Sequence, residues 1–197
     1  MSTEDKYPNW FKQTAQANFE HFLRPMSGQP HLRFLQLGAY TGDASVWLME
    51  NILTGPLSKL TDIDTWQGSD EEQHKSMDFD DVHKTYRKRL KRYIDRVLAI
   101  KSDTMTALVH DLHFSGNEYD FIYIDADHTT VGVLLDAELS WDLLKYGGIM
   151  AFDDYTWNHE SGDPRLAPKV GIDLFLHRHQ GDYETLVVNT QVWLRKK

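Results

Sequence analysis

The chain has 197 residues, of which 41% are hydrophobic and 26% charged, and this composition excludes a disordered or fibrous protein. Its 30 acidic against 21 basic residues give a net charge of −9 at pH 7, which argues against nucleic acid as a partner. The chain has no cysteine for disulfides or zinc–thiolate sites and no apolar run near the about 20 residues of a membrane span, so we expect a cytoplasmic protein without a membrane partner.

Strand-like and helix-like segments alternate along the chain. The predicted strands are short apolar runs, at 32–37, 57–63, 96–100, 119–125 and 149–153. The predicted helices have apolar residues spaced by three or four, and they lie at 8–24, 43–52, 80–93, 105–110, 130–144 and 168–179. We expect Asp43 to cap the second helix, and the glycines after Tyr146 to end the helix over 130–144 in a left-handed C-cap.

Two further apolar runs, 183–188 and 191–194, flank Asn189-Thr190 and predict a hairpin. The alternation of strands and helices predicts a single domain over 1–197 with an α/β, doubly wound fold. Its seven-stranded sheet is mostly parallel, and the hairpin adds an antiparallel edge. Residues 67–83 are polar and long for a connection, so we expect a lid there, with a plain surface loop as the alternative.

Glycine and polar residues follow the first three predicted strands. Gly38-x-x-x-Gly42 lies where a strand turns into a helix, so a ligand can approach the backbone and the free N–H groups of the helix. Asp64 ends the next strand, where an acid can bind a ribose diol, and Ser102-Asp103 ends the third, where an adenine edge could be recognised. The glycine spacing is not G-x-G-x-x-G, and there is no glycine–lysine phosphate loop, so NAD and ATP are disfavoured.

Carboxylates follow the fourth and fifth predicted strands. Asp125 and Asp127 come after the fourth, and Asp153 and Asp154 after the fifth. Neighbouring parallel strands would bring these side chains to one edge of the sheet. Crowded carboxylates need positive charge among them, and oxygen ligands suit Mg²⁺ or another divalent cation. As alternatives, the Asp153-Asp154 pair forms an exposed turn and Asp127 caps the following helix.

Four motifs together resemble the class I S-adenosylmethionine-dependent methyltransferases, and more narrowly the metal-dependent O-methyltransferases of the catechol, caffeoyl-CoA and macrocin types. The resemblance runs in order from Leu32 to Trp157. The motifs are Leu35-Gln-Leu-Gly-Ala-Tyr-Thr-Gly42, Ile63-Asp-Thr-Trp-Gln-Gly68, Tyr123-Ile-Asp-Ala-Asp-His128 and Leu144-Lys-Tyr-Gly-Gly-Ile-Met-Ala-Phe-Asp-Asp-Tyr155.

The resemblance implies S-adenosylmethionine as the methyl donor. The residues that it implies for the donor site are Gln36, Gly38, Tyr40, Gly42, Asp64, Ser102, Asp103 and Asp125. The glycine turn with Tyr40 would hold the methionine part, Asp64 the ribose, and the Ser102-Asp103 pair would lie near adenine. Gln36 stands where the family usually has an acid, so the ammonium group of the donor meets a neutral acceptor there.

The resemblance also implies a metal site and a catalytic base. The implied metal ligands are Asp125, Asp153 and Asp154, with Mg²⁺ or another divalent cation. His128 stands where catechol-type enzymes carry a basic lysine, which implies that His128 with Asp125 forms the catalytic pair. A histidine pKa near about 6.5 suits proton removal at neutral pH. The alternative is that His128 only caps the next helix or is solvated.

The predicted function is methyl transfer to a hydroxyl group of a small molecule, a sugar or a polyphenol, with a divalent cation assisting. A metal-independent O- or N-methyltransferase and a non-catalytic S-adenosylmethionine-binding module are the alternatives, and an NAD-dependent enzyme is least favoured. The N-terminal helix could cap the site or mediate a homodimer. Candidates for the acceptor pocket, left unassigned, are Trp66, His74, Met77, Phe79, His83, Tyr155, Trp157 and His159.

Overall fold

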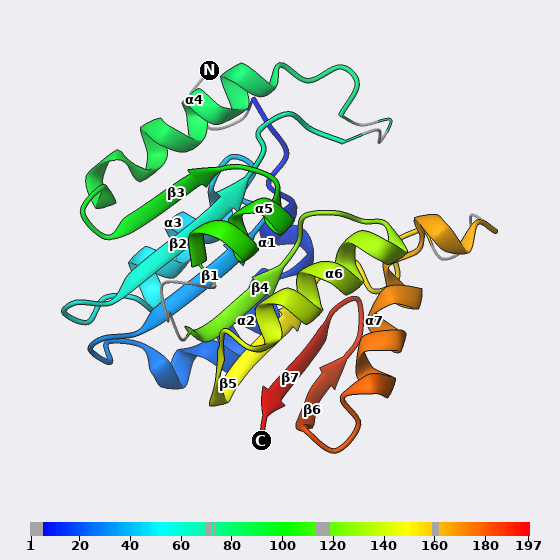
Figure 1. Cartoon of the computed structure of the whole chain (residues 1–197). Coiled ribbons are helices and arrows are strands. Elements are labelled where there is room, and N and C mark those ends of the chain that lie inside the picture. Colours follow the sequence, from blue (N-terminus) through cyan, green and yellow to red (C-terminus); the bar gives the residue numbers. More distant parts are fainter. Residues whose placement is uncertain (1–5, 70–71, 73, 113–118, 159–161) are drawn as a thin grey trace.

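A twisted sheet of seven strands forms the centre of the molecule, seen in the computed structural model (Figure 1), which describes residues 6–69, 72, 74–112, 119–158 and 162–197. The strand order is β3-β2-β1-β4-β5-β7-β6. The strands are β1 Arg33–Leu37, β2 Lys59–Asp64, β3 Val97–Lys101, β4 Tyr119–Ile124, β5 Leu144–Phe152, β6 Tyr183–Val188 and β7 Val192–Lys196. Strands β1 to β5 pair in parallel, and β7 runs antiparallel to β5 and β6. The predicted doubly wound α/β fold with an antiparallel hairpin is confirmed.

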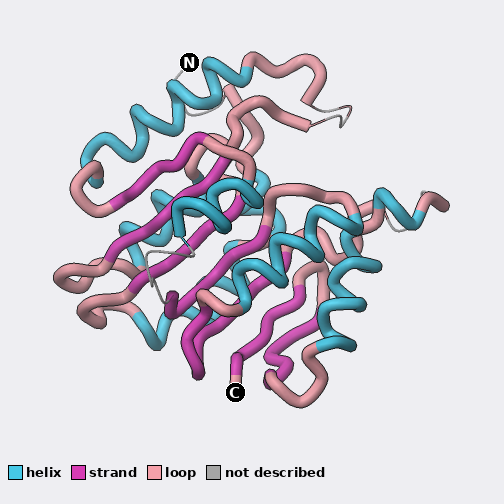
Figure 2. The backbone as a smooth tube through the Cα atoms, viewed as in Figure 1, coloured by secondary structure: helices cyan, strands magenta, loops and turns pink. Residues whose placement is uncertain are grey.

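Helices cover both faces of the sheet (Figure 2). They are α1 Trp10–Thr14, α2 Gln16–Leu23, α3 Asp43–Asn51, α4 Phe79–Leu90, α5 Thr104–Thr106, α6 Thr130–Trp141 and α7 Pro168–Arg178. Alternate residues of β4 point to opposite faces, so Phe121 packs in one apolar cluster with Phe19 of α2, and Ile122 packs in the other with Trp141 of α6. Both faces are therefore buried, as the apolar strands predicted. None of the helices described is both long and apolar enough to cross a bilayer.

Two predicted helix ends were wrong. The glycines after Tyr146 lie inside β5, where the pairing with β4 shifts register between Tyr119 and Phe121, so they form an irregularity in a strand and not a helix C-cap. A glycine in the left-handed region is compatible with a helix C-cap and with an irregular strand, and Gly147 has a φ of 78°. The second wrong end is the start of α3, where Gly42 and not Asp43 occupies the N-cap, with a φ of 83°.

The predicted N-terminal helix over 8–24 is divided into α1 and α2 at Ala15. Asn9 caps α1 by accepting a hydrogen bond from the backbone N–H of Lys12, and its amide donates to Asp43 Oδ1 at 2.9 Å. In the segment predicted as a lid, residues from Phe79 onward form α4, which Asp78 caps by accepting from Asp81 N–H. Residues 70, 71 and 73 of that segment lie outside the described part of the chain.

Candidate active site

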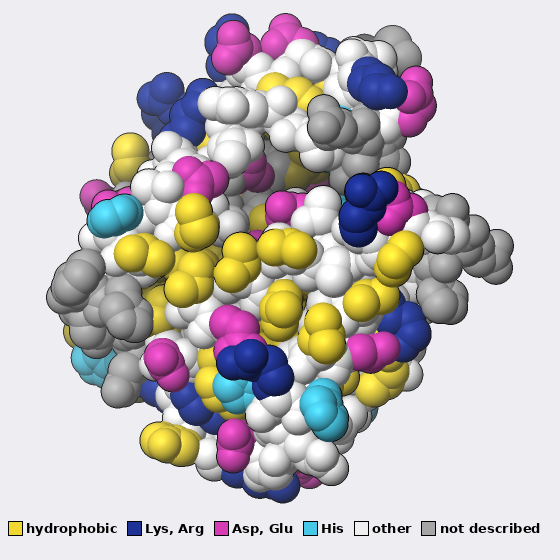
Figure 3. All heavy atoms as spheres, turned by 45° about the vertical axis from the view of Figure 1, so that its right-hand side comes forward, with side chains coloured by type: hydrophobic (Ala, Val, Ile, Leu, Met, Phe, Trp, Pro, Cys, Tyr) yellow, Lys and Arg dark blue, Asp and Glu magenta, His cyan; other side chains and the backbone are white. Residues whose placement is uncertain are grey.

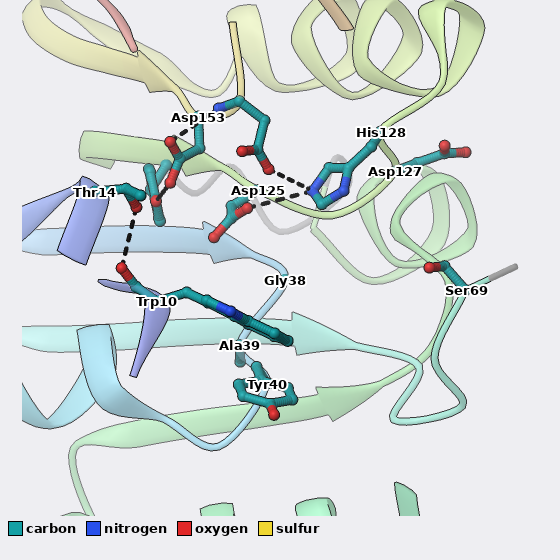
Figure 4. A network of polar contacts seen from close by, with 12 residues as sticks. Trp10, Thr14, Gly38, Ala39, Tyr40, Ser69, Asp125, Asp127, His128 and Asp153 are labelled. Carbon is teal, nitrogen blue, oxygen red and sulfur yellow. Dashed lines mark hydrogen bonds and ion pairs between the residues drawn. The ribbon is translucent and has the colours of Figure 1, made fainter. Parts of the chain in front are cut away.

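The carboxyl ends of β4 and β5 lie side by side, as predicted. The two strands pair in parallel up to Ile124 and Phe152, and Asp153 N–H donates to Ile124 O at 3.0 Å. His128 Nε2 lies 3.0 Å from Asp154 Oδ2 and 3.5 Å from Asp125 Oδ1 (Figure 4). One ligand atom each from Asp125, His128 and Asp154 lies within 4.8 Å of the others, which is close enough to share a metal ion.

Asp153 lies beside this cluster, and its carboxylate is held by other groups. Its Oδ2 accepts a hydrogen bond from the hydroxyl of Tyr123, which is 1% exposed, and its Oδ1 accepts from Asp154 N–H at 2.8 Å. Asp154 has a φ of 54°, and this left-handed turn directs its carboxylate to His128. The structure thus brings together two of the three predicted metal ligands and adds the predicted base, while Asp153 is buried and does not form an exposed turn.

The electrostatics of the cluster favour a bound positive charge. Burial and then the repulsion of Asp153 raise the pKa of Asp125 to about 8, against the lowering effect of the contact with His128. The side chain of Asp125 is nevertheless 32% exposed, so a ligand can reach it. Asp127 lies outside the cluster: its Oδ1 accepts from Thr129 N–H at 2.8 Å, next to the start of α6. A proton or a cation among these acids would relieve the repulsion.

The glycine turn after β1 lies directly against the end of β4. A Cβ atom on Gly38 would lie 1.8 Å from Asp125 O, so only glycine allows this approach. Asp64 holds the turn: its Oδ2 accepts from the N–H groups of Ala39 and Tyr40, both at 2.8 Å, and its Oδ1 accepts from Trp66 N–H at 2.6 Å. Asp64 Oδ1 keeps a lone pair for one more donor.

Gln36 lies under the same turn and is 3% exposed. Its Nε2 donates to Gly38 O at 2.8 Å, while its Oε1 has no hydrogen-bond partner among the described residues. A buried acceptor without a donor is costly, so a ligand with an N–H group at this position would satisfy it.

The ends of β2 and β3 border a cavity of about 340 Å³, lined by Thr65, Gln67, Lys101, Ser102 and Asp103. Ser102 N–H donates to Asp64 O at 3.1 Å, so the two strand-end turns are joined. Asp103 Oδ1 accepts from Thr106 N–H at 2.8 Å, which caps α5 and lowers the pKa of Asp103. The space-filling view shows a hollow between the part of the molecule that carries α4 and the part below it (Figure 3).

Only some of the candidate residues for the acceptor pocket lie open beside the cluster. Trp66 is 2% exposed and stacks on His83 with centroids 4.2 Å apart, so it belongs to the core. Trp157 lies 6.3 Å from the His128 ring and is 39% exposed, so it can meet an acceptor. Tyr155 is turned to α7 instead, with its hydroxyl on Asp173 at 2.8 Å.

Trp10 of α1 is a site residue that the sequence did not single out. Its ring lies 4.8 Å from that of Tyr40 in the glycine turn and 5.9 Å from that of His74, and Figure 4 shows it on the glycine-turn side of Asp125. In the sequence it is one apolar residue of an amphipathic helix among several, with no signal that separates it from the rest. His159, also predicted, lies outside the described residues.

Comparison with known proteins identifies a matching family. The profile of a family described as a methyltransferase domain matches residues 35–155, a segment that contains the glycine turn and both strand-end acidic groups. The tapetum-specific methyltransferase 1 of Arabidopsis thaliana is 41% identical over 58 residues. That match covers 29% of this chain and 24% of the relative, so the chain spans about a quarter of that protein.

Solved structures share the fold. A protein of Clostridium thermocellum described as a candidate rRNA methylase superposes with a TM-score of 0.66 and 14% identity, covering 93% of this chain and 98% of that one. The MycE methyltransferase of the mycinamycin biosynthetic pathway, solved with Mg and SAH, gives a TM-score of 0.59 at 14% identity, covering 91% of this chain and 49% of that one. At such identities the likeness concerns the fold alone.

Proposed function

The chain belongs to the methyltransferase domain family, as an S-adenosylmethionine-dependent enzyme, and from that premise we propose that it methylates a hydroxyl group of a small molecule with the help of a divalent cation. The observation that supports this proposal is the cluster of Asp125, His128 and Asp154 beside the glycine turn. It combines ligands for a cation with a group that can accept a proton, next to the place where a donor would bind.

The residues around the glycine turn fit S-adenosylmethionine, which supplies an electrophilic methyl group. The orphaned Gln36 Oε1 can accept a hydrogen bond from the ammonium group of the methionine part. The remaining lone pair of Asp64 Oδ1 can accept one from a ribose hydroxyl, and the adjoining cavity beside Ser102 and Asp103 can take the adenine. Gly38 leaves the backbone open to the donor, because a side chain there would displace Asp125.

The acidic cluster fits a divalent cation. Asp125 and Asp154 offer carboxylate oxygens, which Mg²⁺ prefers, and an acceptor molecule can supply further oxygens. A cation held there would lower the pKa of an acceptor hydroxyl. Asp153 supports the site by holding Asp154 N–H, and its other oxygen accepts the hydroxyl of Tyr123. We therefore assign the ligand role first to Asp125 and Asp154.

His128 is suited to remove the proton of the acceptor. With Mg²⁺ held by oxygens, Nε2 of His128 would donate its hydrogen to Asp154, and Nδ1 would be the nitrogen that accepts the proton. The contact of 3.0 Å with Asp154 orients the ring and would stabilise the imidazolium that forms. The side chain is 21% exposed, so an acceptor can reach it.

The test is turnover of S-adenosylmethionine to S-adenosylhomocysteine over a set of hydroxylated acceptors, before and after EDTA treatment. We expect EDTA to abolish turnover and added Mg²⁺ to restore it. Asp154→Ala should lose turnover while calorimetry shows retained binding of S-adenosylhomocysteine, and Asp153→Ala should do the same. Unchanged turnover after EDTA would contradict the role of the cation.

One observation favours a second candidate, metal-independent O- or N-methylation. His128 contacts both Asp125 and Asp154 directly, so the three residues form an acid–base group that needs no cation. Calorimetric titration of Mg²⁺ and Mn²⁺, with and without S-adenosylhomocysteine, separates the two candidates. Binding of a metal at one site per chain supports the first, and turnover without any metal binding supports the second.

A further inference from the structure

The turn after β3 depends on neighbours for its position. Strand β3 lies at the edge of the sheet, and the Ser102-Asp103 turn that follows it leads into α5, Thr104–Thr106, which continues as a π-helix over Ala107–Leu112. On one side, Ser102 N–H bonds to Asp64 O at 3.1 Å. On the other, the hydroxyl of Thr104 donates a hydrogen bond to Asp136 Oδ1 of α6.

Asp136 is an unusual choice for its surroundings. The residue is 2% exposed, and its neighbours in the sequence of α6, Val133 and Ala137, belong to an apolar cluster with Ala107 and Leu108. Its Oδ2 has no hydrogen-bond partner among the described residues. Burial, with smaller contributions from Asp127 and Asp103, raises the pKa of Asp136 to about 7.

A carboxyl group placed in this way is a poor means of stabilising the helix, since an apolar residue of similar size would avoid its desolvation. The contact with Thr104 is what the carboxyl group provides and an apolar residue could not. That contact joins α6 to the turn beside the cavity of about 340 Å³. Asp136 therefore contributes to the position of the Ser102-Asp103 turn and not to the stability of the core.

We propose that Asp136 is a positioning residue: through Thr104 it fixes the Ser102-Asp103 turn against the adenine ring and sets the preference of the enzyme for that base. The inference rests on the proposed donor site. Asp103 Oδ1 is occupied by Thr106 N–H, which leaves Oδ2 to accept a hydrogen bond from the 6-amino group of adenine. A base with a carbonyl oxygen at that position would meet the carboxylate with the wrong polarity.

The experiment compares two probes, S-adenosylhomocysteine and S-inosylhomocysteine, whose bases differ in the 6-amino group and the 6-oxo group. Calorimetry gives a Kd for each, and the ratio of the two measures base selectivity. We expect wild type to prefer the adenine compound and Thr104→Val to reduce the ratio by about tenfold, as expected for a hydrogen bond lost from alignment. Thr104→Ser, which keeps the hydroxyl, should retain the ratio.

Two further variants separate positioning from stability. Asp136→Asn keeps the Oδ1 acceptor for Thr104 and should retain the ratio. The double variant Thr104→Val with Asp136→Leu removes both polar groups. Its melting temperature should be higher than that of Thr104→Val alone, while its Kd ratio should stay as low as in Thr104→Val. Ser140→Ala is the matched control, because it removes a buried hydroxyl of α6 that donates within its own helix, to Asp136 O and Ala137 O. It should leave the ratio unchanged.

The results distinguish this inference from the proposed function. If wild type binds neither probe, the donor site itself is wrong. If wild type prefers the adenine compound and Thr104→Val, folded to the same extent, shows the same preference, the positioning role of Asp136 is overturned while the donor site stands.

Discussion

Removing the hydroxyl of Tyr86 should destabilise the protein more at high pH than at low pH. Tyr86 of α4 donates this hydroxyl to Asp62 Oδ2 of β2 at 2.7 Å, and Asp62 is 0% exposed. Burial raises the pKa of Asp62 to about 7 from its ordinary 3.8, although the bond from Tyr86 opposes the rise. Asp62 is therefore neutral in the native state at pH 5 and ionised at pH 9.

The charge on Asp62 sets the size of the effect. At pH 5 Tyr86→Phe removes a bond to a neutral carboxyl group, worth about 1 kcal/mol, and at pH 9 it removes a bond to a buried carboxylate, worth about 2 to 3 kcal/mol. Because unfolded Asp62 ionises near 3.8 and native Asp62 near 7, unfolding releases a proton in that window, and the contribution of this group to the free energy of unfolding falls as the pH rises through it. Tyr86→Phe lacks the bond that lowers the native pKa of Asp62. In this variant the free energy of unfolding therefore continues to fall to a higher pH than in wild type.

Urea unfolding of wild type and Tyr86→Phe at pH 5 and pH 9 measures the effect. Tyr119→Phe is the control, since the buried Tyr119 hydroxyl contacts the neutral Thr61 Oγ1 at 3.4 Å and its loss should be small and equal at both pH values. An equal loss for Tyr86→Phe at pH 5 and pH 9, or a larger loss at pH 5, would refute the reasoning about Asp62.

Three further predictions concern the site. Asp154→Asn should lower metal-dependent turnover by at least about a hundredfold, as expected when a ligand charge is removed, while the Kd of S-adenosylhomocysteine from calorimetry stays within about threefold. Gly38→Ala should abolish binding of S-adenosylhomocysteine and lower the melting temperature, because its Cβ would lie 1.8 Å from Asp125 O; normal binding would contradict this geometry. Gln36→Glu should lower the melting temperature of the free protein but increase its rise with S-adenosylmethionine, because the ammonium group would then pair with a buried charge; an unchanged rise places that group elsewhere.

The strands could be predicted from the sequence because their signals are strong and local. The apolar run Tyr119–Ile124 has no other stable use than a strand buried on both faces, and it ends at an acid. The start of β5 could not be predicted in the same way. A left-handed glycine such as Gly147 ends a helix or interrupts a strand equally well, and only the pairing of Leu144 with Tyr119 decides between them.

The gathering of the acids after β4 and β5 at one edge of the sheet could also be predicted, because the topology of parallel strands places their carboxyl ends together. The direction of each side chain could not. Whether Asp154 faces His128 depends on a φ of 54° that aspartate adopts only in some contexts. The position of Trp10 depends on the break between α1 and α2 and on the bond from Asn9 to Asp43, both set by tertiary contacts.

The adjacent residues Asp153 and Asp154 make different contacts for a physical reason. Side chains of successive residues in a strand point to opposite faces, so two adjacent acids at a strand end cannot both face one site without a change of backbone conformation. Here the left-handed turn at Asp154 turns the second acid toward His128, and Asp153 Oδ1 accepts the N–H of that same residue. The hydroxyl of Tyr123 satisfies the other oxygen of Asp153 in the core. Loss of Asp153 would thus act on the cluster through Asp154, whose conformation it holds, and its effect on turnover does not by itself make it a metal ligand.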